Sequence, residues 1–140
     1  MRRIAFALCL ATVSALLLAG PAGAVTVTYR GQATSVDPGF RYGKVTVRRV
    51  GTRVTFVEIK AVSAYCAGQP MLRTIVFRPG MQVISGSNRI VRGVMRITYR
   101  PVRSAKSWTR MRIVFSGRRA TGTFDETGLC TDRGRFTAAR

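Results

Sequence analysis

The sequence predicts an all-β protein: an antiparallel β-sandwich of jelly-roll-like or immunoglobulin-like topology, with a β-barrel as the alternative architecture. Three observations lead to this prediction. Short segments that alternate polar and apolar residues recur along the chain, and period two is the pattern of a half-buried strand. Glycine, proline and asparagine separate these segments at near-regular spacing, as they do in sandwiches and barrels. After residue 24, no segment sustains a helical period.

The first 24 residues have the pattern of a secretory signal peptide. Arg2 and Arg3 precede an almost wholly apolar run over residues 4–18, and Ala22-Gly23-Ala24 is a small-residue cleavage site. The apolar run is too short for a stable membrane span. We therefore expect an exported protein, extracellular or associated with the cell envelope, with a single secreted β-domain over residues 25–140.

Turn residues divide that domain into ten expected strands. Gly51-Thr52 has glycine first in a two-residue loop, which is typical of a tight hairpin. Asp37-Pro38-Gly39, Arg78-Pro79-Gly80 and Gly86-Ser87-Asn88 also have the composition of turns. The strands are expected at residues 25–29, 44–50, 53–61, 71–77, 81–85, 89–91, 94–100, 109–115, 119–124 and 134–138.

The chain is strongly basic, with 24 Lys and Arg residues against five Asp and Glu residues and no histidine. Removal of residues 1–24 would leave 22 basic residues and a net charge of +17. This charge exceeds what the solubility of a small domain requires, and arginine suits phosphate and carboxylate groups. A GC-rich genome would produce the same arginine bias, so selection for binding and biased composition both remain open.

Arginines alternate with core residues in three consecutive expected strands, residues 94–100, 109–115 and 119–124. If these strands pair as a meander, their arginines share one exposed face. The loop before residue 109 adds cations and the single tryptophan, a ring that suits stacking on a base or a sugar. The predicted polyanion-binding residues are Arg96, Arg100, Arg103, Lys106, Trp108, Arg110, Arg112 and Arg119. The expected partners are anionic wall or extracellular polymers or anionic lipid headgroups, with nucleic acid bound only non-specifically; a solvated basic face is the alternative.

Two cysteines, Cys66 and Cys130, would remain after cleavage, because Cys9 lies in the apolar run. An exported chain meets an oxidising compartment, so these two are predicted to form a disulfide. A metal pair or a reactive thiol is less favoured, because no histidine is present to complete a zinc site or to activate a thiolate.

The sequence predicts no catalytic residue and no cofactor, because it lacks histidine, a glycine-rich phosphate loop and known metalloenzyme motifs. Two other functions remain as alternatives. A carboxylate-dependent glycosidase could use Glu58 with Glu126 or Asp125. A protein-binding or protease-inhibitor module could present residues 65–72 as a loop held by the disulfide.

The segment 122–132 places Asp125, Glu126 and Asp132 around Cys130. The three carboxylates lack the alternating spacing of a calcium loop, although a looser cation site remains an alternative. Asp-Glu-Thr-Gly has the composition of a turn. We therefore interpret the segment as a disulfide-stapled hairpin turn with no metal, whose acids act as counter-charges for the basic domain.

The C-terminal part carries a "G-x-x-A-x-G-T-F" motif at residues 117–124, followed by Cys130 and by Phe136-Thr137-Ala138. Together with Cys66, this pattern resembles the ending of small exported β-proteins of uncharacterised function from actinobacteria. The resemblance implies secretion, a β-fold and one disulfide, and it carries no functional residues over.

Overall fold

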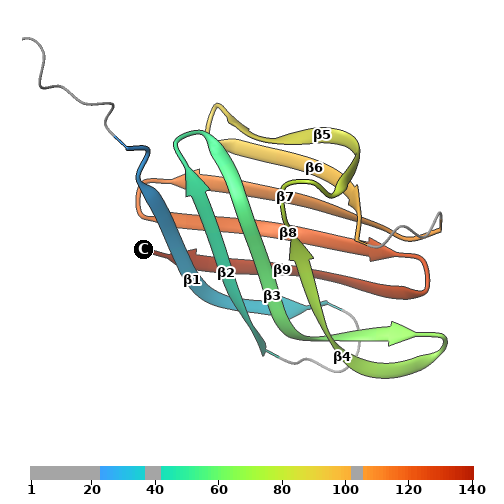
Figure 1. Ribbon diagram of the computed structural model, residues 1–140. Helices are drawn as coiled ribbons and strands as arrows, with labels where there is room; N and C mark the ends of the chain where they lie inside the picture. The colour runs from blue at the N-terminus through green and yellow to red at the C-terminus, as the bar shows by residue number, and fades with distance from the viewer. Residues whose placement is uncertain (1–22, 37–41, 102–105) are drawn as a thin grey trace, which may run out of the picture.

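The computed structural model describes residues 23–36, 42–101 and 106–140. Most of the expected signal peptide, residues 1–22, lies outside these ranges. Within these ranges, nine β-strands follow one another (Figure 1), and no helix is long and apolar enough to cross a membrane. The strands are β1 (Thr26–Ser35), β2 (Tyr42–Val50), β3 (Arg53–Cys66), β4 (Gln69–Phe77), β5 (Gln82–Val91), β6 (Val94–Arg100), β7 (Trp108–Ser116), β8 (Arg119–Thr127) and β9 (Cys130–Ala139).

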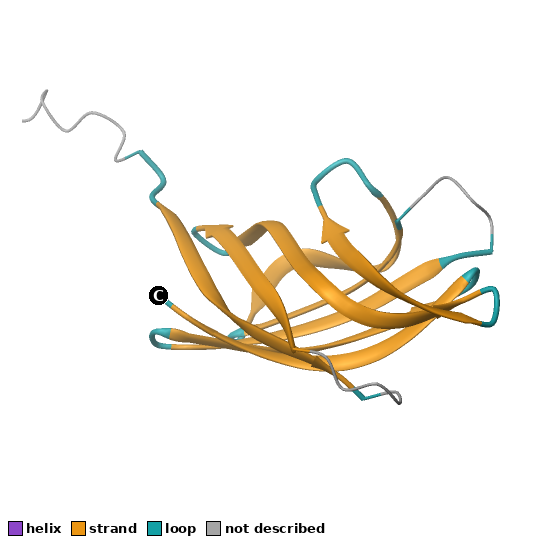
Figure 2. Cartoon of the chain, turned by 90° about the horizontal axis from the view of Figure 1, so that it is seen from below, coloured by secondary structure: helices purple, strands orange, loops and turns teal. Residues whose placement is uncertain are grey.

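Eight of the strands form a closed antiparallel ring. Their spatial order is β1, β2, β3, β5, β6, β7, β8 and β9, and β9 pairs back with β1. The remaining strand, β4, pairs with β3 outside this ring. Figure 2 shows the sheet curling so that its two halves lie one above the other. The fold is therefore a small, flattened β-barrel with one added strand.

The ring closes through a narrow contact between β3 and β5. Arg53 pairs with Arg89, and the backbone N–H of Ile90 donates to the Thr52 carbonyl oxygen at 2.7 Å. The Asn88 side-chain amide donates to the Val54 carbonyl oxygen at 3.0 Å. A side-chain hydrogen bond thus supplements the short backbone ladder at this junction.

The all-β antiparallel prediction is confirmed, and a barrel replaces the sandwich that was the leading architecture. Inward and outward positions alternate in the same way in both architectures, so the pattern alone did not separate them. The ring depends on β3, whose 14 residues pair with β2 and also reach β4, β5 and β9. The expected strand at residues 53–61 was too short to make the last of these contacts.

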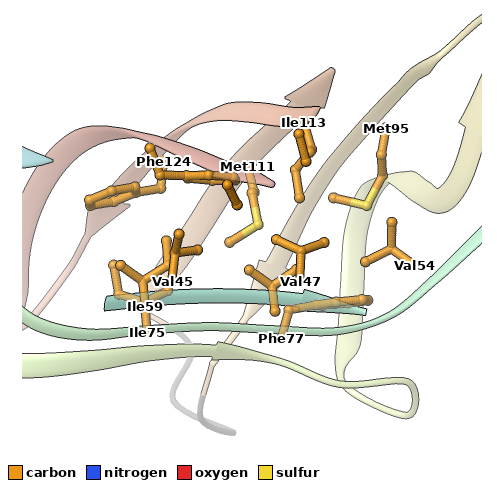
Figure 3. Packing of buried hydrophobic residues seen from close by; sticks show 14 of the residues in the cluster. Val45, Val47, Val54, Ile59, Ile75, Phe77, Met95, Met111, Ile113 and Phe124 are labelled. Atoms are coloured by element: carbon orange, nitrogen blue, oxygen red, sulfur yellow. The ribbon is translucent and has the colours of Figure 1, made fainter. Parts of the chain in front are cut away.

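Apolar side chains from all around the ring fill its interior (Figure 3). The alternation expected for β6, β7 and β8 is confirmed, because their inward residues are buried or, at Phe115 and Gly122, partly buried, and the intervening arginines and threonines are not buried. Tyr29 and Tyr99 add aromatic packing through edge contacts with Phe115 and Phe77, at centroid distances of 5.5 and 5.2 Å. One continuous core therefore stabilises the described strands.

One turn expected from sequence is absent. Residues 86–88 lie inside β5, which was expected as two strands. The register against β6 shifts on both sides of this segment, and Gly86 has a φ of 74°. The glycine thus permits a bulge in a continuous strand. Bulges and turns both favour glycine, so the composition of this segment did not distinguish them.

Two glycine–phenylalanine pairs shape β8 and β9. Gly122 lies opposite Phe136, and Phe124 lies opposite Gly134. A Cβ added to either glycine would lie 2.3 Å from the ring of the phenylalanine across from it. Each ring therefore covers the glycine of the neighbouring strand, an arrangement that supports strong coiling in small barrels.

Gly134→Ala is expected to lower the free energy of unfolding by about 2 kcal/mol, because the site is already filled. The new Cβ would lie 2.5 Å from the Thr34 carbonyl oxygen, a backbone atom that cannot rotate away. Denaturant unfolding measures the change, and Ser116→Ala at an exposed position of β7 is the control, with a change within about 0.5 kcal/mol. Equal stability of the two variants would show that the strands separate to accept the methyl group.

Candidate anion-binding surface

Strand pairing aligns arginines in a row across the outer wall of the barrel. Arg96 of β6 lies directly opposite Arg112 of β7, and Arg112 lies opposite Thr123 of β8. Thr123 in turn lies opposite Arg135 of β9. Directly opposed residues share one face, with Cβ atoms about 5 Å apart. The row therefore sets like charges side by side, which costs stability and favours an anionic partner.

Neighbouring positions extend this row into a surface. Arg110 and Arg133 flank Asp125 in the adjacent row, while Arg119 and Arg30 lie opposite Ala139 on its two sides. We call the whole set the outer arginine face. Its members are Arg30, Arg96, Arg110, Arg112, Arg119, Arg133 and Arg135.

Two open grooves of about 720 and 770 Å³ cross the outer arginine face. Arg112, Thr123 and Arg135 line both grooves, so the two form one continuous surface over β6, β7, β8, β9 and β1. Among the described residues that line them, Asp125 is the one carboxylate. Neither of the ion pairs found in the described part of the chain involves this face. The surface therefore presents guanidinium groups beside threonine hydroxyls.

The structure brings together part of the predicted polyanion-binding set. Arg96, Arg110, Arg112 and Arg119 all line the grooves. Arg100 lies opposite Gln82 of β5 and lines neither groove. The remaining residues of the set are at one end of the barrel or outside the described residues.

Trp108 is half-buried, and the guanidinium of Arg110 lies 5.1 Å from the centre of its ring. The ring therefore contacts a cation of its own strand, and it is only partly accessible for the stacking on a base or a sugar that was expected from sequence. Lys106 is exposed, next to the turn between β8 and β9. Arg103 lies outside the described residues.

Sequence reasoning missed three members of the outer arginine face: Arg30, Arg133 and Arg135. The sequence pattern that could have identified two of them lies in β9, where Arg133 and Arg135 alternate with buried positions. Arg30 lies on β1, which is adjacent to β9 only in the folded barrel. Its place could not be read from local alternation.

Glu126 and Asp132 lie inside the barrel rather than in a turn. They are opposite each other on β8 and β9 and are only 3% and 1% exposed. The expected hairpin is present, but its turn is at residues 128–129. The expected place of these two acids in the turn is wrong, because β8 and β9 extend further than predicted, whereas a counter-charge role fits the outward position of Asp125 and the ion pair of Glu126 with Arg73.

Arg73 and Ser35 provide polar contacts for the two buried acids. Nη2 of Arg73, on β4, lies 3.0 Å from Oε1 of Glu126, and the Ser35 hydroxyl donates to Oδ1 of Asp132 at 2.6 Å. Burial raises the pKa of the Glu126 carboxyl; the Arg73 guanidinium opposes this rise and the Asp132 carboxyl adds to it. Burial likewise raises the pKa of the Tyr99 phenol, whose hydroxyl donates to the Val76 carbonyl oxygen at 3.0 Å. Among the described residues, no group of three or more acidic or cysteine side chains is arranged to hold a metal ion.

The structure also shows where the residues of the two alternative functions lie. Glu58 alternates with buried Val57 and Ile59 and lies 3.4 Å from Lys60, so it faces away from the interior that contains Glu126. The segment at residues 65–72 is the far end of the β3–β4 hairpin, turning at Ala67 and Gly68 with φ values of 50° and 80°. Glu58 therefore does not face Glu126 as a glycosidase pair would, whereas residues 65–72 form a largely exposed hairpin end that the disulfide joins to β9.

The predicted disulfide is confirmed: Cys66 and Cys130 are bonded, with their Cα atoms 4.0 Å apart. Comparisons of the chain with protein-family models, with curated proteins and with solved structures give no match. The geometry of the barrel is therefore the basis for any functional proposal.

Proposed function

We propose that the protein is exported and binds linear anionic polymers of the cell envelope through the outer arginine face. The observation that supports this proposal is the row in which Arg96, Arg112 and Arg135 share one face of the wall. Seven arginines and one carboxylate line the two grooves. The sheet fixes the backbone positions of these arginines before binding, which lowers the ordering cost of association.

The chemistry of this face favours phosphate, sulfate or carboxylate groups repeated along a chain. Guanidinium groups bind such anions through two parallel hydrogen bonds, and the threonine hydroxyls between them add neutral donors. Binding of a polyanion at several sites releases condensed counterions, so affinity falls steeply with salt. The function proposed is therefore non-catalytic binding with little sequence selectivity.

Arg112→Ala with Arg135→Ala, the two arginines shared by both grooves, is expected to weaken binding to heparin or long-chain polyphosphate by at least about tenfold. The slope of log affinity against log salt should fall by about two, one for each lost anion contact. Affinity is measured by titration of the polymer at several salt concentrations.

Arg53→Ala with Arg89→Ala is the matched control, because it removes the same charge from an exposed pair where β3 meets β5. This control is expected to retain nearly the affinity and the salt slope of the wild type. An equal loss in both double variants would show that net charge alone drives binding, and would overturn the assignment to the outer arginine face.

A further inference from the structure

Four large apolar side chains are exposed at the end of the barrel that carries the disulfide. Tyr65 is 37% exposed, Met71 50%, Leu72 51% and Leu129 78%. The first three belong to the far end of the β3–β4 hairpin, and Leu129 is in the turn between β8 and β9. Figure 1 shows these two hairpin ends at the same end of the molecule. We call the four residues the apolar tip.

The apolar tip is held together covalently. The Cys66–Cys130 disulfide joins the two hairpins, and the backbone N–H of Ala67 donates to the Leu129 carbonyl oxygen at 3.1 Å. Tyr65 also pairs with Thr131 of β9. The apolar side chains are therefore presented by a preorganised framework, and ordering them costs little on binding.

The hairpin exposes its apolar residues on both faces. The first four residues of β4 are all exposed, and the alternation of buried and exposed positions begins only after Leu72. Met71 lies opposite Ala64 on one face, whereas Leu72 lies on the other. Apolar side chains on both faces suit insertion into the headgroup boundary of a bilayer, which can contact both faces of an inserted element.

The segments that form the tip are uncharged, and one exposed cation, Lys106, lies beside them. Residues 61–72 and 127–131 contain no acidic or basic residue, and the acids directly before and after the second segment, Glu126 and Asp132, are buried. Lys106 is exposed beside the tip, since its carbonyl oxygen would lie 2.8 Å from a Cβ on Gly128. Cations beside an inserted apolar group strengthen attachment to anionic headgroups.

We propose that the apolar tip inserts into the headgroup boundary of an anionic lipid membrane and so anchors the barrel at the membrane surface. Leu72 and Leu129 supply apolar area, and Tyr65 suits the interface because its ring is apolar and its hydroxyl is polar. The tip contains no residue of the outer arginine face. The anchor and the polymer-binding surface can therefore be tested separately.

The test is flotation with vesicles of the oxidised protein that lacks residues 1–24. These residues are removed because the apolar run at residues 4–18 would itself bind lipid. The wild type is expected to float with phosphatidylcholine vesicles and more strongly when phosphatidylglycerol is included. Leu72→Ser with Leu129→Ser should lower the partition coefficient on both vesicles by about a hundredfold, or about tenfold for each leucine. Val91→Ser, at the 64% exposed last residue of β5, is the control and should bind like the wild type.

Two results would overturn the anchor. The first is flotation of the leucine double variant equal to that of the wild type, which would attribute lipid binding to the arginines alone. The second is a dimer in sedimentation velocity that the same double variant abolishes, without flotation of the wild type; the tip would then bind a second copy of the chain. The double variant Arg112→Ala with Arg135→Ala should keep its binding to phosphatidylcholine vesicles, so failure of the polymer-binding proposal leaves this result unchanged.

Discussion

Replacement of both Cys66 and Cys130 by alanine is expected to lower the free energy of unfolding by roughly 4 kcal/mol. The two residues are 64 positions apart, and opening a covalent loop of this length restores much conformational freedom to the unfolded chain. They also form one of the two residue pairs that join β3 to β9. Urea unfolding of the double variant and of the oxidised wild type measures the difference.

The reduced wild type is the control for this experiment, because reduction removes the bond and keeps both side chains. It should unfold at nearly the same urea concentration as the double variant, and a reductant should leave the double variant unchanged. A reduced wild type as stable as the oxidised protein would contradict the prediction. It would mean that the backbone pairing alone holds the two hairpins together.

The sequence was most informative where strands are half-buried. The alternation in β6 and β7 predicted their inward and outward residues correctly, from Met95 to Ile113, because period two maps directly onto the two faces of a sheet. Gly51 in its two-residue loop likewise marked the β2–β3 hairpin, with a φ of 55°. Both features depend on residues that are neighbours in the sequence, so the sequence pattern was enough to predict them.

Closure of the sheet is a long-range property, and it was not predictable from these patterns. The barrel depends on β1 meeting β9 and on Arg53 meeting Arg89. No residue type marks such a contact in the sequence. Gly86 was ambiguous for a related reason, since glycine allows a positive φ in a bulge as well as in a turn.

The candidate surface was predicted only in part, because its full extent also depends on closure of the sheet. The alternation on neighbouring strands located Arg96 and Arg112, while Arg30 joins them only because the ring closes. The acids of segment 122–132 show the opposite error. Carboxylates are rarely buried, so composition favoured an exposed turn, and the compensating Arg73 is more than 50 residues away on another strand.

Arg73→Ala is expected to lower the free energy of unfolding by about 3 kcal/mol at pH 7, because it leaves the buried Glu126 carboxylate without its cation. Glu126 is only 3% exposed, so little hydration is available to replace the guanidinium. Glu126→Gln in the same background should recover most of this loss, since the amide carries no charge. Lys60→Ala, which breaks the more exposed pair with Glu58, is the control and should change stability by no more than about 0.5 kcal/mol.

The pH dependence of unfolding tests the same carboxyl directly. The folded-state pKa of Glu126 is raised by burial, so the folded protein binds a proton more tightly there than the unfolded chain does. Below the ordinary pKa of glutamate, this bound proton makes its full contribution to the free energy of unfolding. The contribution is lost as pH rises through the higher pKa of the folded state. The chain has no histidine and both described cysteines are bonded, so between about pH 5 and 7 no other side chain with an ordinary pKa titrates.

In that window, we expect the free energy of unfolding of the wild type to fall with rising pH, by at most about 1.4 kcal/mol per pH unit for one proton. Arg73→Ala removes the interaction that holds the pKa of Glu126 down, so its decline should continue to higher pH. Glu126→Gln should remove the slope in both backgrounds. A flat profile for both the wild type and Arg73→Ala would mean that Glu126 stays ionised inside the barrel, and the buried pair would then be an ordinary ion pair.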